Sequence, residues 1–181
     1  MEQDKKQRAP RRGGRNQRDR RGQGGETQEF EQEIIELARV TRVMAGGKRM
    51  RFRACVVVGD RKGRVGYGIA KGQDVSMAIA KASTQAKKNI FTVALVDSRT
   101  IPHEVTVKYK AARIFLKPAK EGTGMKAGGA LRKVLDLAGV IDITSKMHGS
   151  HNKINNVRAT FKALEHLLPV VRQEKKVKAL V

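Results

Sequence analysis

Residues 40-VTRVMAGGKRMRFRACVVVGDRKGRVGYGIAKG-72 contain the clearest strand and turn signals of this chain. Gly46 and Gly47 separate two runs of apolar and β-branched residues, which is a β-hairpin signal. The sequence GDRKG predicts a second tight turn, and a third strand that contains Gly66 and Gly68 follows it. Glycine inside a strand indicates a bulge or the close approach of another backbone. The stretch therefore predicts three antiparallel strands.

Arginines alternate with apolar residues along the second of these strands. Arg49, Arg51 and Arg53 occupy every second position, so they share one face of a β-strand. The sequence from Arg39 to Arg53 contains six basic residues and no acid, whereas a solvated strand face usually mixes both signs. We therefore expect a phosphate-facing surface, made by these arginines together with Arg39 and Arg42 of the preceding strand.

The whole chain is strongly basic. It has 39 Lys and Arg against 17 Asp and Glu, a formal net charge of +22 in 181 residues. Self-repulsion on this scale favours a polyanionic partner, and nucleic acid is the leading candidate because each neutralised phosphate releases counterions. A membrane surface is the alternative, but no apolar run approaches the roughly 20 residues that span a bilayer. The single cysteine, Cys55, excludes an intrachain disulfide and predicts a buried, inert thiol in a reducing, cytoplasmic setting.

A helix is expected after the three strands. Asp74 is a plausible N-cap for the segment 75–91, in which apolar residues recur at helical spacing. Such a sheet buries one face against its helix and leaves the other face free to bind.

A second set of elements is expected after Pro102. Strands or helices are predicted at 103–118, as one bent strand or two strands, then at about 127–138, at 140–148 and from about Asn152. In the last helix a core stripe recurs at spacings of 3 and 4: Ile154, Val157, Phe161, Leu164 and Leu168.

The predicted fold class is α+β in two small domains, 29–97 and 98–168, between a basic N-terminal arm at 1–28 and a basic tail at 169–181. The arm is rich in Arg and Gly and contains almost nothing to bury, so we expect it to be disordered until bound. An arm that orders on RNA is favoured over a merely solubilising tail.

The glycine-rich sequence 118-PAKEGTGMKAGG-129 raises the question of a nucleotide site. Gly122, Gly124 and Ala127 fit the spacing G-x-G-x-x-G/A, and Asp142 lies 20 residues after Gly122, where a ribose-binding acid is expected. Four residues separate the preceding strand from Gly122, however, and too few elements follow to complete the sheet of a dinucleotide-dependent oxidoreductase. An anion site, close packing against another chain and a helix entry without a ligand all stay open for this loop.

Candidate catalytic and metal-binding groups are scattered along the sequence. His148 and His151 have the spacing of half a metal site, but no acid or cysteine is placed to complete it. No Ser/His/Asp arrangement can be named. The sequence therefore predicts no enzyme, no metal site and no cofactor.

Three stretches in this order resemble bacterial small-subunit ribosomal protein five. They are 40–72, quoted above, 117-KPAKEGTGMKAGGALRKVLDLAGV-140 and 149-GSHNKINNVRATFKALEHL-167, and the likeness extends over about 32–168. The resemblance implies an N-terminal domain like a double-stranded-RNA-binding module, with a three-stranded antiparallel sheet plus a helix. It also implies a C-terminal α+β domain with a left-handed βαβ crossover.

The same resemblance implies a structural constituent of the small ribosomal subunit, in the cytoplasm, that binds small-subunit ribosomal RNA. It implies roles in head–body geometry and translational accuracy, with small-subunit proteins four and eight as neighbours and the mRNA entry path nearby. No membrane and no small-molecule cofactor are expected. A free-standing double-stranded-RNA-binding regulator is the alternative function.

Taken with the charge pattern, the resemblance gives two sets of expected site residues. Those expected to contact RNA are Arg39, Thr41, Arg42, Gly46, Gly47, Lys48, Arg49, Arg51, Arg53, Arg61, Lys62, Arg64, Lys71 and Lys126. Gly122, Gly124 and Arg132 are expected at a protein interface that faces protein four.

Overall fold

The computed structural model describes residues 30–167, so the predicted arm at 1–28 and tail at 169–181 lie outside the described residues. The first sheet is antiparallel in the order β1-β2-β3-β4. Its strands are β1 (Glu31–Met44), β2 (Gly47–Gly59), β3 (Arg64–Gly72) and the short β4 (Phe91–Thr92). The three predicted strands are confirmed, and β4 adds a fourth that the sequence pattern did not indicate.

The β1–β2 hairpin has the two-residue turn that its glycines predict. Met44 pairs with Gly47 across the turn, and Gly46 has a φ of +87°, a left-handed conformation that favours glycine. A register shift between Ile34 and Glu36 bends β1 where it passes over the rest of the molecule.

The helix α1 (Val75–Lys88) lies directly against β3. A Cβ atom on Gly66 would stand 2.5 Å from the carbonyl oxygen of Ala86, and one on Gly68 would stand 2.0 Å from that of Ala82. The strand glycines therefore mark a close backbone approach. The helix ends three residues before the predicted end at 91, because Phe91 joins β4. Asp74 is the N-cap residue, although its side chain accepts no capping hydrogen bond.

The second domain contains β5 (Val105–Tyr109), β6 (Ala112–Pro118), β7 (Met125–Lys126), α2 (Gly129–Leu137), β8 (Ile143–His148) and α3 (Lys153–Glu165). Its sheet has the order β5-β6-β8-β7, antiparallel except for the parallel pair β7 and β8. Segment 103–118 is thus two strands, and β7-α2-β8 is the βαβ unit that the resemblance implies. The hand of that crossover stays a prediction.

The helix α3 begins where the sequence predicts. The Asn152 side-chain oxygen accepts hydrogen bonds from the backbone N–H groups of Ile154, at 3.0 Å, and Asn155, at 3.3 Å. This N-cap satisfies donors that the first turn of a helix leaves free.

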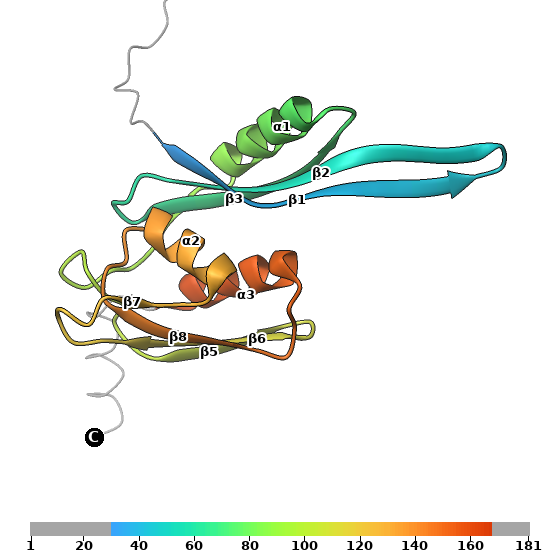
Figure 1. Cartoon of the computed structure of the whole chain (residues 1–181). Helices are drawn as coiled ribbons and strands as arrows, with labels where there is room; N and C mark the ends of the chain where they lie inside the picture. The colour runs from blue at the N-terminus through green and yellow to red at the C-terminus, as the bar shows by residue number, and fades with distance from the viewer. Residues whose placement is uncertain (1–29, 168–181) are drawn as a thin grey trace, which may run out of the picture.

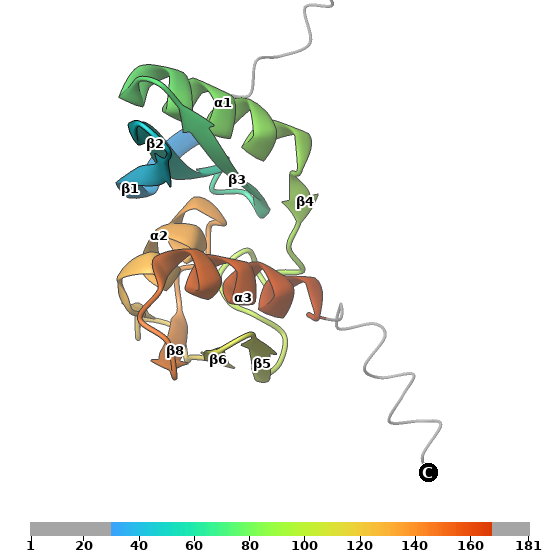
Figure 2. The ribbon, with the colours of Figure 1, turned by 90° about the vertical axis from the view of Figure 1, so that its right-hand side faces the viewer.

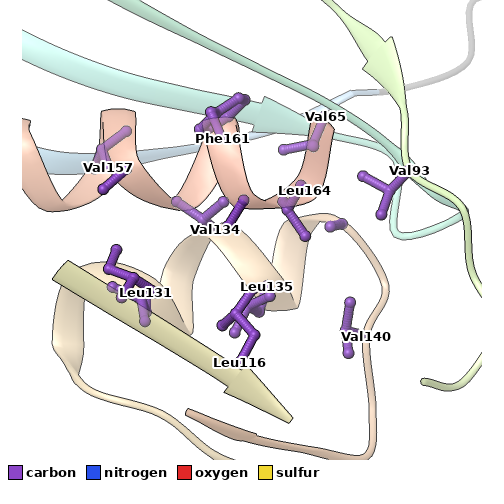
Figure 3. Packing of buried hydrophobic residues seen from close by; sticks show 14 of the residues in the cluster. Val65, Val93, Leu116, Leu131, Val134, Leu135, Val140, Val157, Phe161 and Leu164 are labelled. Atoms are coloured by element: carbon purple, nitrogen blue, oxygen red, sulfur yellow. The ribbon is translucent and has the colours of Figure 1, made fainter. Parts of the chain in front are cut away.

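The two domains share one hydrophobic core. Helices α2 and α3 lie between the two sheets (Figures 1 and 2), and Val57 and Val65 of the first sheet join one buried cluster with Leu131 and Leu164 of the helices. Figure 3 shows this packing, in which Val65 of the first sheet lies in the same cluster as Phe161 and Leu164 of α3. The expectation that one face of the first sheet is free to bind is therefore wrong for its inner half. That half carries apolar side chains on both faces, so the second domain covers what α1 does not.

Candidate nucleic-acid interface

The outer half of the β1–β2 hairpin extends past α1 and past the second domain (Figure 1). Every residue from 41 to 51 is exposed, including Val43 and Met50. The outer half of the hairpin does not pack against the hydrophobic core. Both of its faces are therefore available to a binding partner.

One face of this outer half gathers like charges. Arg42 lies directly opposite Arg49 across β1 and β2, and Arg53 lies opposite Lys71 across β2 and β3, while Arg51 stands between them on the same face. Like charges directly opposite each other in a sheet are destabilising. In the part of the chain that the structure describes, no carboxylate forms an ion pair with Arg42, Arg49, Arg51 or Lys71. The face therefore lacks a counter-charge that a bound anion would supply.

This face is hollowed. A concavity of about 380 Å³ is lined by Val40, Thr41, Arg42, Met44, Arg49, Arg51 and Lys71. A second concavity of about 220 Å³ shares Arg51 and Lys71 with the first. It continues past the end of β3 to Gln73, which precedes α1, and to Lys81 in the middle of that helix. We call the two together the basic groove, and its cations are Arg42, Arg49, Arg51, Lys71 and Lys81.

Arg53 differs from the other arginines of its strand. Its guanidinium Nη2 lies 3.6 Å from the Glu36 carboxylate, and the residue is half-buried beside the second domain. The alternation of side chains along β2 correctly places Arg53 on the basic face, but its charge is paired with the Glu36 carboxylate within the chain.

Three predicted contacts lie on the opposite face of the hairpin. Arg39 pairs with Phe52 and Thr41 with Met50, so their side chains are on the face that leads toward α1, and Lys48 follows the same alternation. Thr41 nevertheless also borders the first concavity of the basic groove. The expectation that Arg39 shares a face with Arg49 and Arg51 is wrong, because two strands must be brought into register before faces can be compared. Gly46 lies in the hairpin turn, and Gly47 is the first residue of β2 directly after it.

Three further predicted contacts lie at the other end of the sheet, in the β2–β3 turn. Arg61 pairs with Glu31 at 2.9 Å and with Asp136 at 3.7 Å, and Arg64 donates to Asp60 at 2.8 Å while its guanidinium lies 5.2 Å from the Phe30 ring centroid. Lys62 is exposed. The structure therefore does not bring this group together with the basic groove.

Asp60 organises that turn. Its carboxylate accepts hydrogen bonds from the backbone N–H groups of Lys62 and Arg64 and from the Arg64 side chain. Burial would raise the pKa of Asp60, but these hydrogen bonds and the Arg64 charge outweigh it and lower the pKa below its ordinary value.

The glycine loop is a turn that precedes β7, and α2 begins only at Gly129. Gly122 and Gly124 have φ values of +80° and +70°, with nothing within 4 Å of a Cβ atom at either. They are therefore required for backbone conformation and do not mark a close approach. Because neither stands at a helix start, the helix-terminus anion site considered for this loop does not form around them.

Asp142, which the dinucleotide pattern placed at a ribose, has a different role. It is only 1% exposed, its carboxylate accepts from the Gly124 backbone N–H at 2.9 Å, and it pairs with Arg99 at 3.3 Å. The acid ties the glycine loop to the segment that joins the two domains. Its position explains the glycine spacing without a nucleotide.

Other predicted groups lie on the surface of the second domain. Lys126 is exposed on β7 and Arg132 on α2. In the first domain, burial raises the pKa of the Cys55 thiol to about 11, as an inert thiol requires.

Within residues 30–167, no cluster of three or more His, Cys, Asp or Glu side chains is placed to hold a metal ion. No helix in this range is long and apolar enough to cross a membrane.

Sequence reasoning missed Gln73 and Lys81 as members of the basic groove. In the sequence, Lys81 belongs to a polar helix stripe with Gln85 and Lys88, and this pattern alone does not indicate a binding surface. The docking of α1 against β3 brings Lys81 to the concavity that Arg51 also lines, and that placement depends on tertiary structure.

Comparison with known families follows the two-domain division. A family model described as Ribosomal protein S5, N-terminal domain, matches residues 30–94, and one described as Ribosomal protein S5, C-terminal domain, matches residues 107–175. Together the two matches include most of the chain. The first match contains the first sheet, and the second match contains most of the second sheet. The chain therefore belongs to the ribosomal protein S5 family, whose members are structural proteins of the small ribosomal subunit and not enzymes.

Proposed function

We propose that this chain binds small-subunit ribosomal RNA through the basic groove, with backbone phosphates between its cations. The observation that carries the proposal is the direct pairing of Arg42 with Arg49, neither of which forms an ion pair with a carboxylate among the described residues. A phosphate at this position replaces a repulsive pair with two charge-assisted hydrogen bonds. Arginine also matches the geometry of phosphate oxygens better than lysine does.

The remaining predicted contacts belong to the same proposal in different places. Arg39, Thr41 and Lys48 would meet RNA on the second face of the hairpin. Lys62, at the far end of the sheet, is exposed and free of ion pairs among the described residues. Arg61 and Arg64 would contribute only as far as their acidic partners within the chain allow. A hairpin with cations on both faces is suited to insertion between RNA segments.

The proposal extends to head–body geometry and translational accuracy, with small-subunit proteins four and eight as neighbours beside the mRNA entry path. The protein-facing residues would be Gly122, Gly124 and Arg132, which lie in the second domain, whereas the basic groove is in the first. One chain can thus hold RNA with one domain and a protein with the other. The shared core would transmit strain between the two contacts.

A salt titration of RNA binding tests the proposal. The full chain and its Arg49→Ala/Arg51→Ala variant are titrated with small-subunit ribosomal RNA at several salt concentrations. We expect the variant to bind more weakly and the slope of log K against log salt to fall by about 2, since each phosphate contact contributes roughly 1. Arg53 is left unchanged because its substitution would also break the ion pair with Glu36.

The matched control is Lys153→Ala/Lys162→Ala, which removes two exposed charges from α3. Because α3 lies outside the basic groove, this variant should keep the slope of the unmodified chain. An unchanged slope for Arg49→Ala/Arg51→Ala would contradict the proposal.

A further inference from the structure

The second sheet has an open face that no predicted contact except Lys126 includes. Along β6, the side chains of Ala112, Ile114 and Leu116 are fully buried toward α2 and α3, so those of the alternate residues point the other way. In Figures 1 and 2 both helices lie on one side of this sheet, and no described element covers the other side. The face is thus a solvent-exposed surface of four strands.

Strand pairing collects cations on this face. Lys108 on β5 lies opposite Arg113 on β6, and Phe115 lies opposite Lys146 on β8. Thr144 lies between Lys117 on one side and Lys126 on the other. We call these residues the open sheet face: Thr106, Lys108, Arg113, Phe115, Lys117, Lys126, Thr144, Lys146 and His148.

The charge of the open sheet face is of one sign. The four strands contain no Asp or Glu. Among the described residues, none of the five cations forms an ion pair. A solvated sheet face ordinarily mixes both signs, because like-charged neighbours repel each other. Charge complementarity therefore requires a polyanion as the occupant.

An aromatic ring stands in the middle of these cations. Phe115 is half-buried, lies between Thr106 and Lys146 in the register, and belongs to neither of the described hydrophobic clusters. Its ring is thus not used for folding. An aromatic side chain on a basic sheet is the arrangement on which unpaired bases stack, since every base has a flat π-face.

We propose that the open sheet face binds unpaired RNA, with one base stacked on Phe115 and the phosphates paired with the surrounding lysines and Arg113. A duplex would meet the lysines but could not offer a base to the ring, because its bases are stacked internally. With strands about 4.8 Å apart the face is about 14 Å across, enough for two or three nucleotides. The inference rests on the proposed RNA-binding function but assigns a second site, on the other domain, to a different form of RNA.

The test uses the full chain and a fluorescent oligouridine of about ten nucleotides, a length within the usual site size for unpaired strands. Phe115→Leu keeps an apolar side chain and removes the ring. We expect it to weaken binding by about 5- to 50-fold with an unchanged salt slope, as loss of one stacked base requires. The triple variant Lys108→Ala/Lys117→Ala/Lys146→Ala should instead lower the slope by about 2, at roughly 0.7 for each single-strand contact.

The control triple variant Lys87→Ala/Lys88→Ala/Lys153→Ala removes the same charge from exposed helix positions outside both surfaces, and it should keep the slope. A direct readout excludes binding elsewhere on the chain. Oligouridine that contains 4-thiouridine is cross-linked by ultraviolet light, and the adduct is mapped by mass spectrometry. We expect it in the tryptic peptide 114–120, which carries Phe115.

Two outcomes overturn the inference: an absence of adducts in that peptide, or unchanged oligouridine affinity in both open-sheet-face variants. An acidic protein would then be the occupant to seek. Failure of the basic groove is a separate result, because Arg49→Ala/Arg51→Ala should lose affinity for ribosomal RNA and keep the oligouridine adduct at 114–120. The experiments can therefore contradict the proposal for one site and still support the proposal for the other.

Discussion

At the scale of single residues, acids decide where positive charge is held inside the chain and where it is available. Arg53 and Arg64 look like any other arginine in the sequence, yet Glu36 and Asp60 engage them. Arg42, Arg49 and Arg51 have no such partner among the described residues. The basic groove is therefore defined as much by where carboxylates are absent as by where arginines are present.

Replacement of Asp60 by Ala should destabilise the β2–β3 turn by about 1–2 kcal/mol at pH 7, because two backbone donors and the Arg64 guanidinium lose their acceptor. The pKa of Asp60 is lowered on folding, so the carboxylate stabilises the fold above its unfolded pKa of about 4. This contribution is lost as the pH falls through the lower folded pKa. Urea unfolding at several pH values measures the free-energy difference from the unmodified chain, which should narrow below about pH 4.

Glu121→Ala serves as the control, since Glu121 is an exposed acid of the glycine loop without an ion pair among the described residues. Its effect should be small at every pH. A difference for Asp60→Ala that stays constant into acid would contradict the assigned cause.

At the scale of elements, the two pairs of glycines in this chain have different purposes. Gly66 and Gly68 let the backbone of α1 rest on β3, whereas Gly122 and Gly124 supply left-handed turns in open space. A sequence pattern shows both as G-x-G. The three-dimensional surroundings show that the first pair is required because a side chain would clash with α1, and the second pair because the backbone is left-handed there.

Gly68→Ala should therefore cost about 3 kcal/mol or more, because the new methyl group would lie 2.0 Å from the Ala82 carbonyl oxygen and α1 would have to move. Gly122→Ala adds the same atom without a clash and should cost only the left-handed conformation, about 1–2 kcal/mol. Thermal unfolding of both variants gives the comparison. Equal losses of stability would mean that the α1–β3 contact is looser than described.

At the scale of the whole molecule, the two domains are joined by backbone as well as by side chains. The Arg61 N–H donates to the Leu137 carbonyl and the Gly63 N–H to the Ala138 carbonyl, both at 3.0 Å. Gly59 lies against the same end of α2 so closely that a Cβ atom there would stand 2.2 Å from the Leu137 oxygen. The β2–β3 turn thus docks on the C-terminal end of α2, next to the shared core.

Because the core is shared, we expect the two domains to unfold in one transition. Amide hydrogen exchange at Val57 in the first sheet and at Ile114 in the second should report the same free energy of opening. Gly59→Ala should lower both values together, since it disturbs the docking contact. The control Gly129→Ala, where a Cβ atom has nothing within 4 Å, should leave both values unchanged or slightly higher. Independent opening of the two amides would contradict a single cooperative unit.

The local structure of this protein follows from patterns of neighbouring residues in the amino-acid sequence. The strand alternation, the glycine turn at Gly46, the start of α3 after Asn152 and its core stripe as far as Leu164 lie where their patterns predict, because each depends on neighbours within one turn or one strand. Leu168, the last residue of the predicted stripe, lies outside the described residues. The α+β class and the basic character of the hairpin follow from the same local rules. The family motifs add the two-domain order.

Tertiary structure alone decided what each surface faces. Strand register moved Arg39 to the face opposite Arg49, and the second domain covered half of a sheet that local pattern left open. The insertion of β8 between β6 and β7 assembled the open sheet face from segments that are far apart in the chain. The physical reason is that periodicity is set by the backbone of each element, whereas pairing and docking depend on contacts between elements, and no local pattern encodes those contacts.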